Sequence, residues 1–193
     1  MSRVAPPAPE IEGYEHQRPL GSGGFADVYL YTDHLGRDVA VKVLRSTLDD
    51  AETREAFQAE SRLMAKVSGH PFIVEIYTTG VAADGRPYLV MQYYPNPAYS
   101  QRLKAQPLSL AEGLATGVQI CSAVEAAHRA GIIHRDIKPA NLLTDQYGKP
   151  GLSDFGISGT HADDSLGYSP PYAAPEVIED TSPGDQRSDV YSL

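Results

Sequence analysis

The first part of the chain shows the short apolar runs and turns that are typical of strands. β-Branched and other apolar residues gather around Leu20 and over residues 28–31 and 39–44. Glycines over 21–24 and the polar residues 34–37 separate these runs. The pattern predicts three successive strands joined by tight turns.

The spacing then changes from that of strands to that of a helix. Acidic residues over 49–52 favour a helix start, because the N-terminal end of a helix attracts negative charge. Residues three and four apart then predict one helix face: Phe57, Glu60, Met64 and Val67. Two more short strands are predicted after this helix, over 73–78 and 88–93.

Beyond Pro95 and Pro97 the pattern becomes mainly helical. Residues 109–112 form a capping box that predicts a helix running to about Arg129, with Gly131 ending it. The residues expected on or near its buried face are Leu114, Val118, Cys121 and Val124. A strand-rich part followed by a helix-rich part predicts an α+β fold of two lobes that share a cleft.

Composition limits the partners and the compartment of such a fold. A net charge of −9 argues against nucleic acid or a membrane surface as an obligatory partner, since phosphate binding usually needs a basic face. A single cysteine, Cys121, excludes an internal disulfide, and no apolar run reaches the roughly 20 residues of a spanning helix. We therefore expect a soluble cytoplasmic domain, preceded by a flexible, proline-containing segment over residues 1–13.

Two features of the strand-rich part have the chemistry of a phosphate site. The glycines of residues 21–28 would let backbone amides approach an anion, although such a segment is more often only a hairpin. Lys42 lies on an otherwise apolar strand, where an ammonium group is costly without a counterion. Glu60 is the best candidate for that counterion, and a surface ion pair is the alternative.

A second polar cluster follows the long helix. Residues 134–141 contain Asp136, Lys138 and Asn141, and Asp154 follows after a predicted pair of short strands. Phosphoryl transfer needs this set: a group that orients a hydroxyl, oxygen ligands for Mg²⁺, and cations near the phosphate. Alone, the cluster could be an ordinary charged loop; in this order with the lysine strand and glycine loop, chance is a poor explanation.

Together, these motifs resemble the signature set of the protein kinases, and their general style is similar to the bacterial serine/threonine kinases. The resemblance runs over residues 14–193 and includes Ala-Pro-Glu at 174–176. It implies a smaller β lobe over 14–94, with one helix, and part of a helical lobe over 95–193. It also implies transfer of the γ-phosphate of ATP to serine or threonine hydroxyls of proteins.

The resemblance assigns roles to particular residues. It implies that Lys42, positioned by Glu60, holds the α- and β-phosphates, and that Asp136 accepts or orients the substrate hydroxyl proton. Lys138 would lie beside the γ-phosphate, as in serine/threonine-specific kinases. Mg²⁺ would be bound by Asn141 and Asp154. The remaining nucleotide contacts would come from Leu20, Gly21, Ser22, Gly23, Gly24, Phe25, Ala26, Val28, Ala40, Met91, Gln92, Tyr94 and Leu143.

The resemblance also implies elements of regulation. An apolar stack that links the lobes is expected from Met64, Ile76, His134 and Phe155. Arg135 is typical of kinases switched by phosphorylation, for which Ser158, Thr160 and Ser165 are the candidates, while Ser169 matches a substrate-docking residue. Autophosphorylation within a kinase dimer is expected.

The chain stops at Leu193, in a helix begun near Ser188 whose Asp189 would anchor the catalytic loop. The resemblance therefore implies an incomplete second lobe of marginal stability, and a longer protein could be tethered to a membrane through a later region.

A nucleotide-binding regulator without transfer activity is the second hypothesis. A small-molecule phosphotransferase is disfavoured by Lys138 and by residues 174–176, which belong to a peptide-docking segment.

Overall fold

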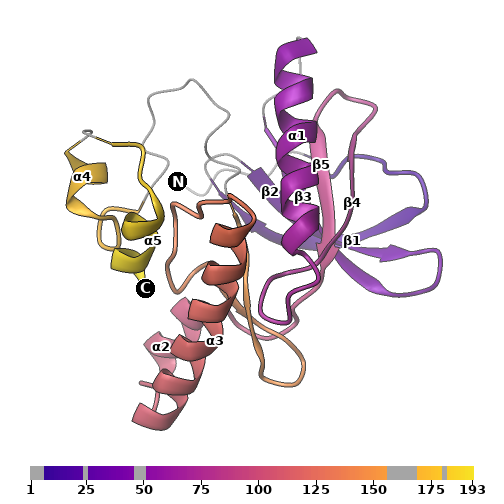
Figure 1. The fold of residues 1–193 in the computed structure, drawn as a ribbon. Coiled ribbons are helices and arrows are strands. Elements are labelled where there is room, and N and C mark those ends of the chain that lie inside the picture. The colour runs from indigo at the N-terminus through magenta and orange to yellow at the C-terminus, as the bar shows by residue number, and fades with distance from the viewer. Residues whose placement is uncertain (1–6, 24–25, 46–50, 156–168, 180–181) are drawn as a thin grey trace. The chain divides into compact units, whose positions relative to one another are not determined.

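The computed structural model describes residues 7–23, 26–45, 51–155, 169–179 and 182–193, except for the side chains of residues 51–54, 56 and 60. The chain forms two compact units (Figure 1). The first consists of Met1–Gln58 and Glu75–Tyr93, and the second of Ala59–Val74 and Tyr94–Leu193. No helix in the described part of the chain is both long and apolar enough to cross a membrane.

The first unit is built on an antiparallel sheet of five strands in the order β1-β2-β3-β5-β4. The strands are β1 (Tyr14–Ser22), β2 (Ala26–Asp33), β3 (Asp38–Leu44), β4 (Ile76–Val81) and β5 (Pro87–Gln92). The first three strands and β5 lie where the hydrophobic pattern predicts them. The strand β4 begins three residues later than expected, because Ile73 and Val74 belong to the second unit, where Ile73 bridges to Leu152.

Strand register divides the residues of this sheet between its two faces. Directly opposed residues on neighbouring strands share a face, and residues two apart on one strand do as well. Val41 pairs with Tyr29 and with Val90, and these residues face the buried cluster of the unit. Lys42 pairs with Val28 and lies on the opposite face. The cluster of Tyr29, Val41 and Val90 therefore lies on the face away from Lys42, whereas the face of Lys42 carries other buried apolar residues, such as Ala40 and Leu89.

Part of the N-terminal segment packs on this core. Ile11 is buried in the same cluster as Tyr31, whose hydroxyl donates a 2.6 Å hydrogen bond to the carbonyl of Pro9. Burial raises the pKa of Tyr31 to about 12, because the charged phenolate would lose its hydration. This packing differs from the flexible segment expected over residues 1–13, since an apolar side chain at position 11 finds a buried site. The beginning of the domain at residue 14 remains a prediction.

The helix of the first half, α1 (Ala51–Val67), has the face that its spacing predicts. Phe57, Met64 and Val67 are buried on it. The side chain of Glu60, which shares this spacing, lies outside the described part of the chain.

The second unit is mainly helical, as expected, with one short hairpin. Its elements are α2 (Tyr99–Ala105), α3 (Leu110–Arg129), β6 (Leu142–Thr144), β7 (Pro150–Leu152), α4 (Pro175–Ile178) and α5 (Gln186–Ser192). The hairpin β6–β7 packs on α3 and sets the position of the segments before and after it.

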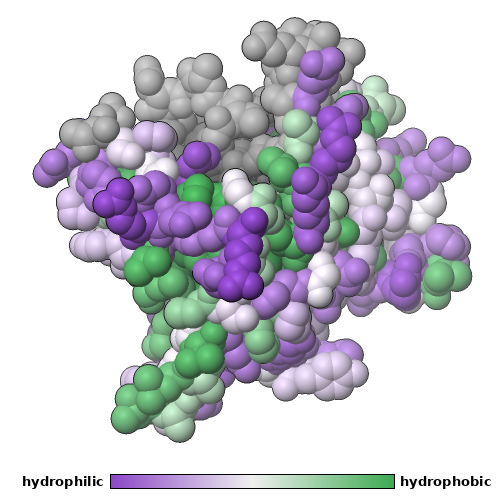
Figure 2. Space-filling model, viewed as in Figure 1, coloured by the Kyte–Doolittle hydropathy of each residue, from purple (hydrophilic) through white to green (hydrophobic). Residues whose placement is uncertain are grey.

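The long helix α3 has the predicted ends and a different buried face. Ser109 and Glu112 form the capping box, and Gly131 follows the last turn with φ of 78°. However, Leu114 and Val118 are 62% and 71% exposed, and the buried row consists of Ile120, Ala123, Val124 and Ala127. The prediction was wrong for Leu114, Val118 and Cys121, because the helix carries two adjacent apolar rows and the row with Ile120 is the buried one. Figure 2 shows hydrophobic side chains over the exposed part of α2 and α3.

Two glycines of this region predict opposite effects of one substitution. Gly131→Ala should lower the free energy of unfolding by about 1 kcal/mol, because its positive φ places a Cβ in a strained conformation. Gly117→Ala, at an exposed position inside α3 with no atom near the added methyl group, should raise it by about 0.5–1 kcal/mol. Chemical denaturation of both variants measures the difference, and shifts of the same sign would contradict the interpretation.

Candidate active site

The glycine-rich segment forms the closed end of the β1–β2 hairpin. The strands pair up to Ser22 and Asp27, and the amide of Gly23 donates a 2.8 Å hydrogen bond to the carbonyl of Ala26. Gly24 and Phe25 lie outside the described residues. Gly21, Ser22 and Gly23 are exposed, whereas Ala26 is buried at the start of β2. The described residues 21–23 thus have an exposed backbone that an anion could approach.

Four of the predicted nucleotide contacts share one face of the sheet. Val28 pairs with Lys42, and Ala40, two residues before Lys42, pairs with Met91. This face carries Lys42 at half-buried depth among apolar neighbours, as the strand pattern predicts. Leu20 is half-buried beside a register shift in β1. Because the Glu60 side chain is not described, the ion pair between Lys42 and Glu60 remains a prediction.

Three further residues were expected to contact adenine. The amide of Gln92 donates a 2.8 Å hydrogen bond to the carbonyl of Glu75, so only its carbonyl could take part in ligand binding. Tyr94 belongs to the second unit and packs against Gly151, where an added side chain would not fit. Leu143, on β6, is half-buried opposite Gly151.

In the second unit, the loop after α3 holds one oxygen of Asp136 and leaves the other without a donor. Asp136 Oδ2 lies 2.6 Å from Lys138 Nζ and accepts a 3.1 Å hydrogen bond from Asn141 Nδ2. Asp136 Oδ1 is buried, and no described residue donates a hydrogen bond to it. Buried carboxylate oxygens normally have a donor, so this exception suits an oxygen that receives a proton or hydrogen bond from a substrate.

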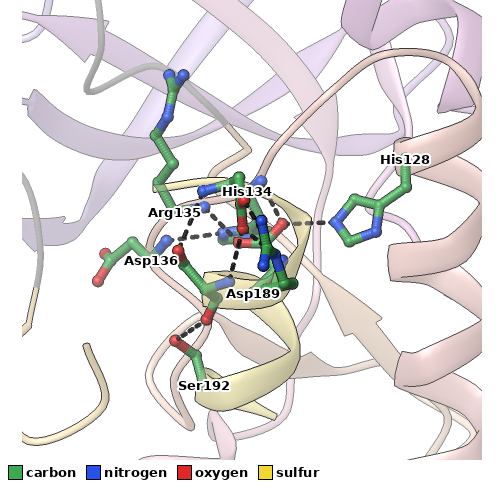
Figure 3. A network of polar contacts seen from close by, with 9 residues as sticks. His128, His134, Arg135, Asp136, Asp189 and Ser192 are labelled. Carbon is green, nitrogen blue, oxygen red and sulfur yellow. Dashed lines mark hydrogen bonds and ion pairs between the residues drawn. The ribbon is translucent and has the colours of Figure 1, made fainter. Parts of the chain in front are cut away.

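Asp189 on α5 holds the backbone of this loop from a distance of more than 50 residues in sequence (Figure 3). Its carboxylate is buried and accepts 2.8 Å hydrogen bonds from the amides of His134 and Arg135 and from Nε2 of His128. The side chain of Arg135 extends away from this network (Figure 3). The anchoring role predicted for Asp189 is therefore supported by three contacts.

His134 is held in one tautomer and stacks on Phe155. Its Nε2 lies 2.9 Å from the carbonyl of Ser153 and must donate, while Nδ1 accepts from the amide of Asp136 at 3.2 Å. Burial lowers the pKa of His134, in keeping with this neutral form. The ring centroids of His134 and Phe155 are 4.5 Å apart. This contact is one part of the expected apolar stack; the rest of the stack, with Ile76, remains a prediction.

Two residues of the site adopt the left-handed backbone conformation that residues other than glycine rarely use. The φ angles are 68° for Arg135 and 63° for Asp154. Such a conformation costs on the order of 1–3 kcal/mol and persists where the surrounding contacts impose it. At Arg135 the hydrogen bond from its amide to Asp189 is one such contact.

The predicted Mg²⁺ ligands are an amide and a carboxylate. Asn141 is buried and donates through Nδ2 to the carbonyl and Oδ2 of Asp136, which fixes the orientation of its amide. Asp154 is half-buried two residues beyond β7. The described residues contain no cluster of three histidines, cysteines or carboxylates that could hold a metal alone. The donor set fits Mg²⁺, which typically takes one or two protein ligands and completes its shell with water and phosphate oxygens.

Beyond Phe155, the described part of the chain resumes at residue 169. Lys138 Nζ donates a 2.7 Å hydrogen bond to the hydroxyl of Ser169, which places the predicted docking residue beside the catalytic loop. The candidate phosphorylation sites Ser158, Thr160 and Ser165 lie outside the described residues. Glu176 accepts a 2.8 Å hydrogen bond from the hydroxyl of Ser188.

The sequence reading missed two groups that support the site. His128 continues the buried row of Ile120 and Val124 at a spacing of four residues. A polar residue on a buried helix face usually has a partner, and this signal could have indicated the contact with Asp189. The second group is an ion pair between Asp27 and Arg45 behind the glycine-rich turn, and the sequence contains no clear sign of it.

Comparisons with known proteins identify the family. A family model described as "Protein kinase domain" matches residues 14–193. Serine/threonine-protein kinase PknK of Mycobacterium tuberculosis is 43% identical over an alignment of 195 residues, which covers 97% of this chain and 17% of PknK. PrkC of Bacillus subtilis, also a serine/threonine-protein kinase, is 37% identical over 190 residues, which cover 93% of this chain and 29% of PrkC.

Solved structures agree with these relatives. The crystal structure of the M. tuberculosis PknI kinase domain matches with a TM-score of 0.73 and 31% identity, over 94% of this chain and 69% of that one. The resemblance inferred from the sequence motifs is thus confirmed, together with the α+β kinase fold. The chain belongs to the protein kinase family, among relatives that are bacterial serine/threonine kinases of the eukaryotic type.

Proposed function

We propose that this chain transfers the γ-phosphoryl group of ATP to serine or threonine hydroxyls of protein substrates. The observation that carries the proposal is the arrangement of Asp136. One of its oxygens is held by Lys138 and Asn141, and the other is buried without a donor among the described residues. An oxygen of this kind can accept the proton of an attacking hydroxyl. Because the chain spans only 17% of PknK, the activity, substrates and partners of a whole protein are also proposals.

The residues proposed to contact the nucleotide and its metal occur in both units. The exposed backbone of residues 21–23 and the ammonium group of Lys42 would bind phosphates, and Val28, Ala40 and Met91 on the face of Lys42 would contact adenine. Asn141 and Asp154 would hold Mg²⁺. When bound, Mg²⁺ neutralises charge on the β- and γ-phosphate oxygens.

The preference for serine and threonine is proposed from Lys138. Its ammonium group contacts both Asp136 and Ser169, at 2.6 and 2.7 Å. It therefore holds one oxygen of the carboxylate whose other oxygen would accept the proton, and it could stabilise charge on a transferring phosphoryl group.

Regulation and organisation are proposed in the same way. Arg135 has an exposed side chain directed away from the Asp189 network, and a phosphate on Ser158, Thr160 or Ser165 could pair with it. Such a phosphate would be added by a second copy of the kinase.

We infer a lobe over 14–94, a second lobe over 95–193, and a cytoplasmic location, since cytoplasm is where ATP is abundant.

Phosphoryl transfer from labelled ATP tests the proposal. The protein, supplied with Mg²⁺, should label itself and a generic basic protein on serine or threonine, and phosphoamino-acid analysis should show little phosphotyrosine. Removing Mg²⁺ with EDTA should lower transfer at least about 100-fold, because two protein oxygens cannot replace the metal charge. Transfer that persists in EDTA, or labelling mainly on tyrosine, would refute the proposal as stated.

A further inference from the structure

The ion pair between Asp27 and Arg45 ties both arms of the glycine-rich hairpin to β3. Arg45 follows β3 directly, and its guanidinium donates to Asp27 Oδ1 at 2.7 Å and to Oδ2 at 3.0 Å. The same Nη2 atom donates a 2.7 Å hydrogen bond to the hydroxyl of Ser22. Ser22 is the last residue of β1 and Asp27 the second residue of β2, so one side chain bridges the two strand ends beside the turn.

This bridge is built from groups that are held firmly. The side chain of Asp27 is 1% exposed and that of Arg45 is 27% exposed. A two-point contact between guanidinium and carboxylate fixes direction as well as distance. The hydrogen bond from Arg45 holds the pKa of Asp27 below its ordinary value although burial opposes this, so the carboxylate stays charged at neutral pH.

Register shows that this bridge lies on the face of the sheet away from Lys42. Asp27 pairs with Val43, whose neighbour Val41 belongs to the buried cluster, whereas Val28 pairs with Lys42. Asp27 therefore cannot touch a phosphate bound on the face of Lys42. Its influence on such a ligand has to pass through the backbone of the strand end at Ser22, which Arg45 also contacts.

We propose that Arg45, Asp27 and Ser22 form a clamp that positions the backbone of residues 21–23 for the triphosphate of ATP. The clamp rests on the proposed nucleotide-binding function and adds positioning residues to it. Backbone amides bind an anion well only when the turn is already in the required shape, because ordering it on binding would weaken the affinity. Loss of the clamp should thus weaken binding through the phosphates and leave the adenosine part unaffected.

The test compares ligands that differ only in phosphates. Calorimetric titration with MgATP and with adenosine should show MgATP binding about tenfold weaker in Arg45→Met and adenosine binding changed less than about twofold. In kinetics, KM for ATP should rise about tenfold with kcat changed little, since an interaction made equally in the ground and transition states affects mainly KM. Arg45→Lys keeps the positive charge and loses the two-point contact. Its affinity for MgATP should lie between those of the unaltered protein and Arg45→Met.

Two further variants separate positioning from general stability. Arg45→Met leaves a buried unpaired carboxylate, so the double variant Asp27→Asn with Arg45→Met removes both charges and keeps the fold testable. The control is Arg37→Met, because Arg37 forms an ion pair with Asp33 at the other end of β2, where its Nε and Nη2 both lie 2.7 Å from Asp33 Oδ2. This control should leave the affinity for MgATP unchanged.

Each outcome decides one question. A selective loss of MgATP affinity in the double variant supports the clamp. An equal loss for both ligands, or no change in either, overturns it, as does the same effect in Arg37→Met. If the unaltered protein binds MgATP but transfers no phosphate, the proposed activity fails while the comparison of ligands still tests the clamp. If it binds no nucleotide, both proposals fail.

Discussion

The variant Asp136→Asn should lower kcat for phosphoryl transfer by about 1,000-fold or more while the affinity for MgATP changes less than about threefold. The amide cannot accept a proton, and acid–base groups of this kind contribute on the order of 100- to 10,000-fold. The donors Lys138 Nζ and Asn141 Nδ2 favour the amide oxygen at the Oδ2 position, so the NH2 group would replace Oδ1, the oxygen proposed to accept the proton. Steady-state kinetics and calorimetric titration of the same preparation measure the two effects.

A second aspartate provides the control for Asp136→Asn. Asp145, in the β6–β7 turn, accepts 2.8 Å hydrogen bonds from the amides of Tyr147 and Lys149 and contacts none of the catalytic groups described above. Asp145→Asn makes the same chemical change in the same unit and should keep kcat within about twofold. Retention of more than about a tenth of kcat by Asp136→Asn would contradict the role of Asp136. Binding of MgATP by the unaltered protein without any transfer would favour the nucleotide-binding regulator.

The local chemistry of the sequence was enough to predict most of the fold. The capping box of Ser109 and Glu112 and the positive φ of Gly131 define the ends of α3 through contacts within a few residues. The alternation of apolar residues around Lys42 was also enough to predict which side chains share its face of the sheet. Short turns set the register of neighbouring antiparallel strands, so this feature is local. These features depend on neighbours in sequence, which a reader of the sequence can see.

The errors concern contacts between distant segments. Whether Val118 or Ile120 is buried depends on which of two adjacent apolar rows of α3 meets β7, and the helix alone carries no information on this choice. The missed helix α2 has only seven residues and no side-chain cap, so its local signal is weak. The shift of β4 arises because Ile73 pairs with Leu152, almost 80 residues later.

The same difference between local and distant contacts applies to the residues of the site. The motifs indicated Asp136, Lys138 and Asn141 correctly as neighbours, since they lie within six residues. The supports of the site, such as His128 behind Asp189 and Arg45 behind Asp27, are separated by 61 and 18 residues and appear only with the fold. Sequence motifs thus identify groups that perform chemistry more readily than groups that hold them in place.

The variant Asp189→Ala should affect both stability and catalysis, because this carboxylate is the acceptor for two buried amides. Without it the amides of His134 and Arg135 lose their partner, and each buried unsatisfied group costs about 1–3 kcal/mol. We expect the free energy of unfolding to fall by about 3 kcal/mol or more. The backbone of Arg135 would no longer be held at its positive φ, so the adjoining Asp136 would lose its position. A misplaced catalytic group of this kind typically costs about 100-fold in rate.

A variant at the start of the same helix separates these two effects. Asp185 caps α5 through hydrogen bonds from the amides of Arg187 and Ser188, and it is exposed. Asp185→Ala should lower the free energy of unfolding by about 1 kcal/mol through loss of the cap, with kcat nearly unchanged. Both variants are compared at a temperature where circular dichroism shows them folded. If Asp189→Ala then keeps the kcat of the unaltered protein, Asp189 only stabilises α5; a 100-fold loss in the folded variant means that its contacts position Asp136 for catalysis.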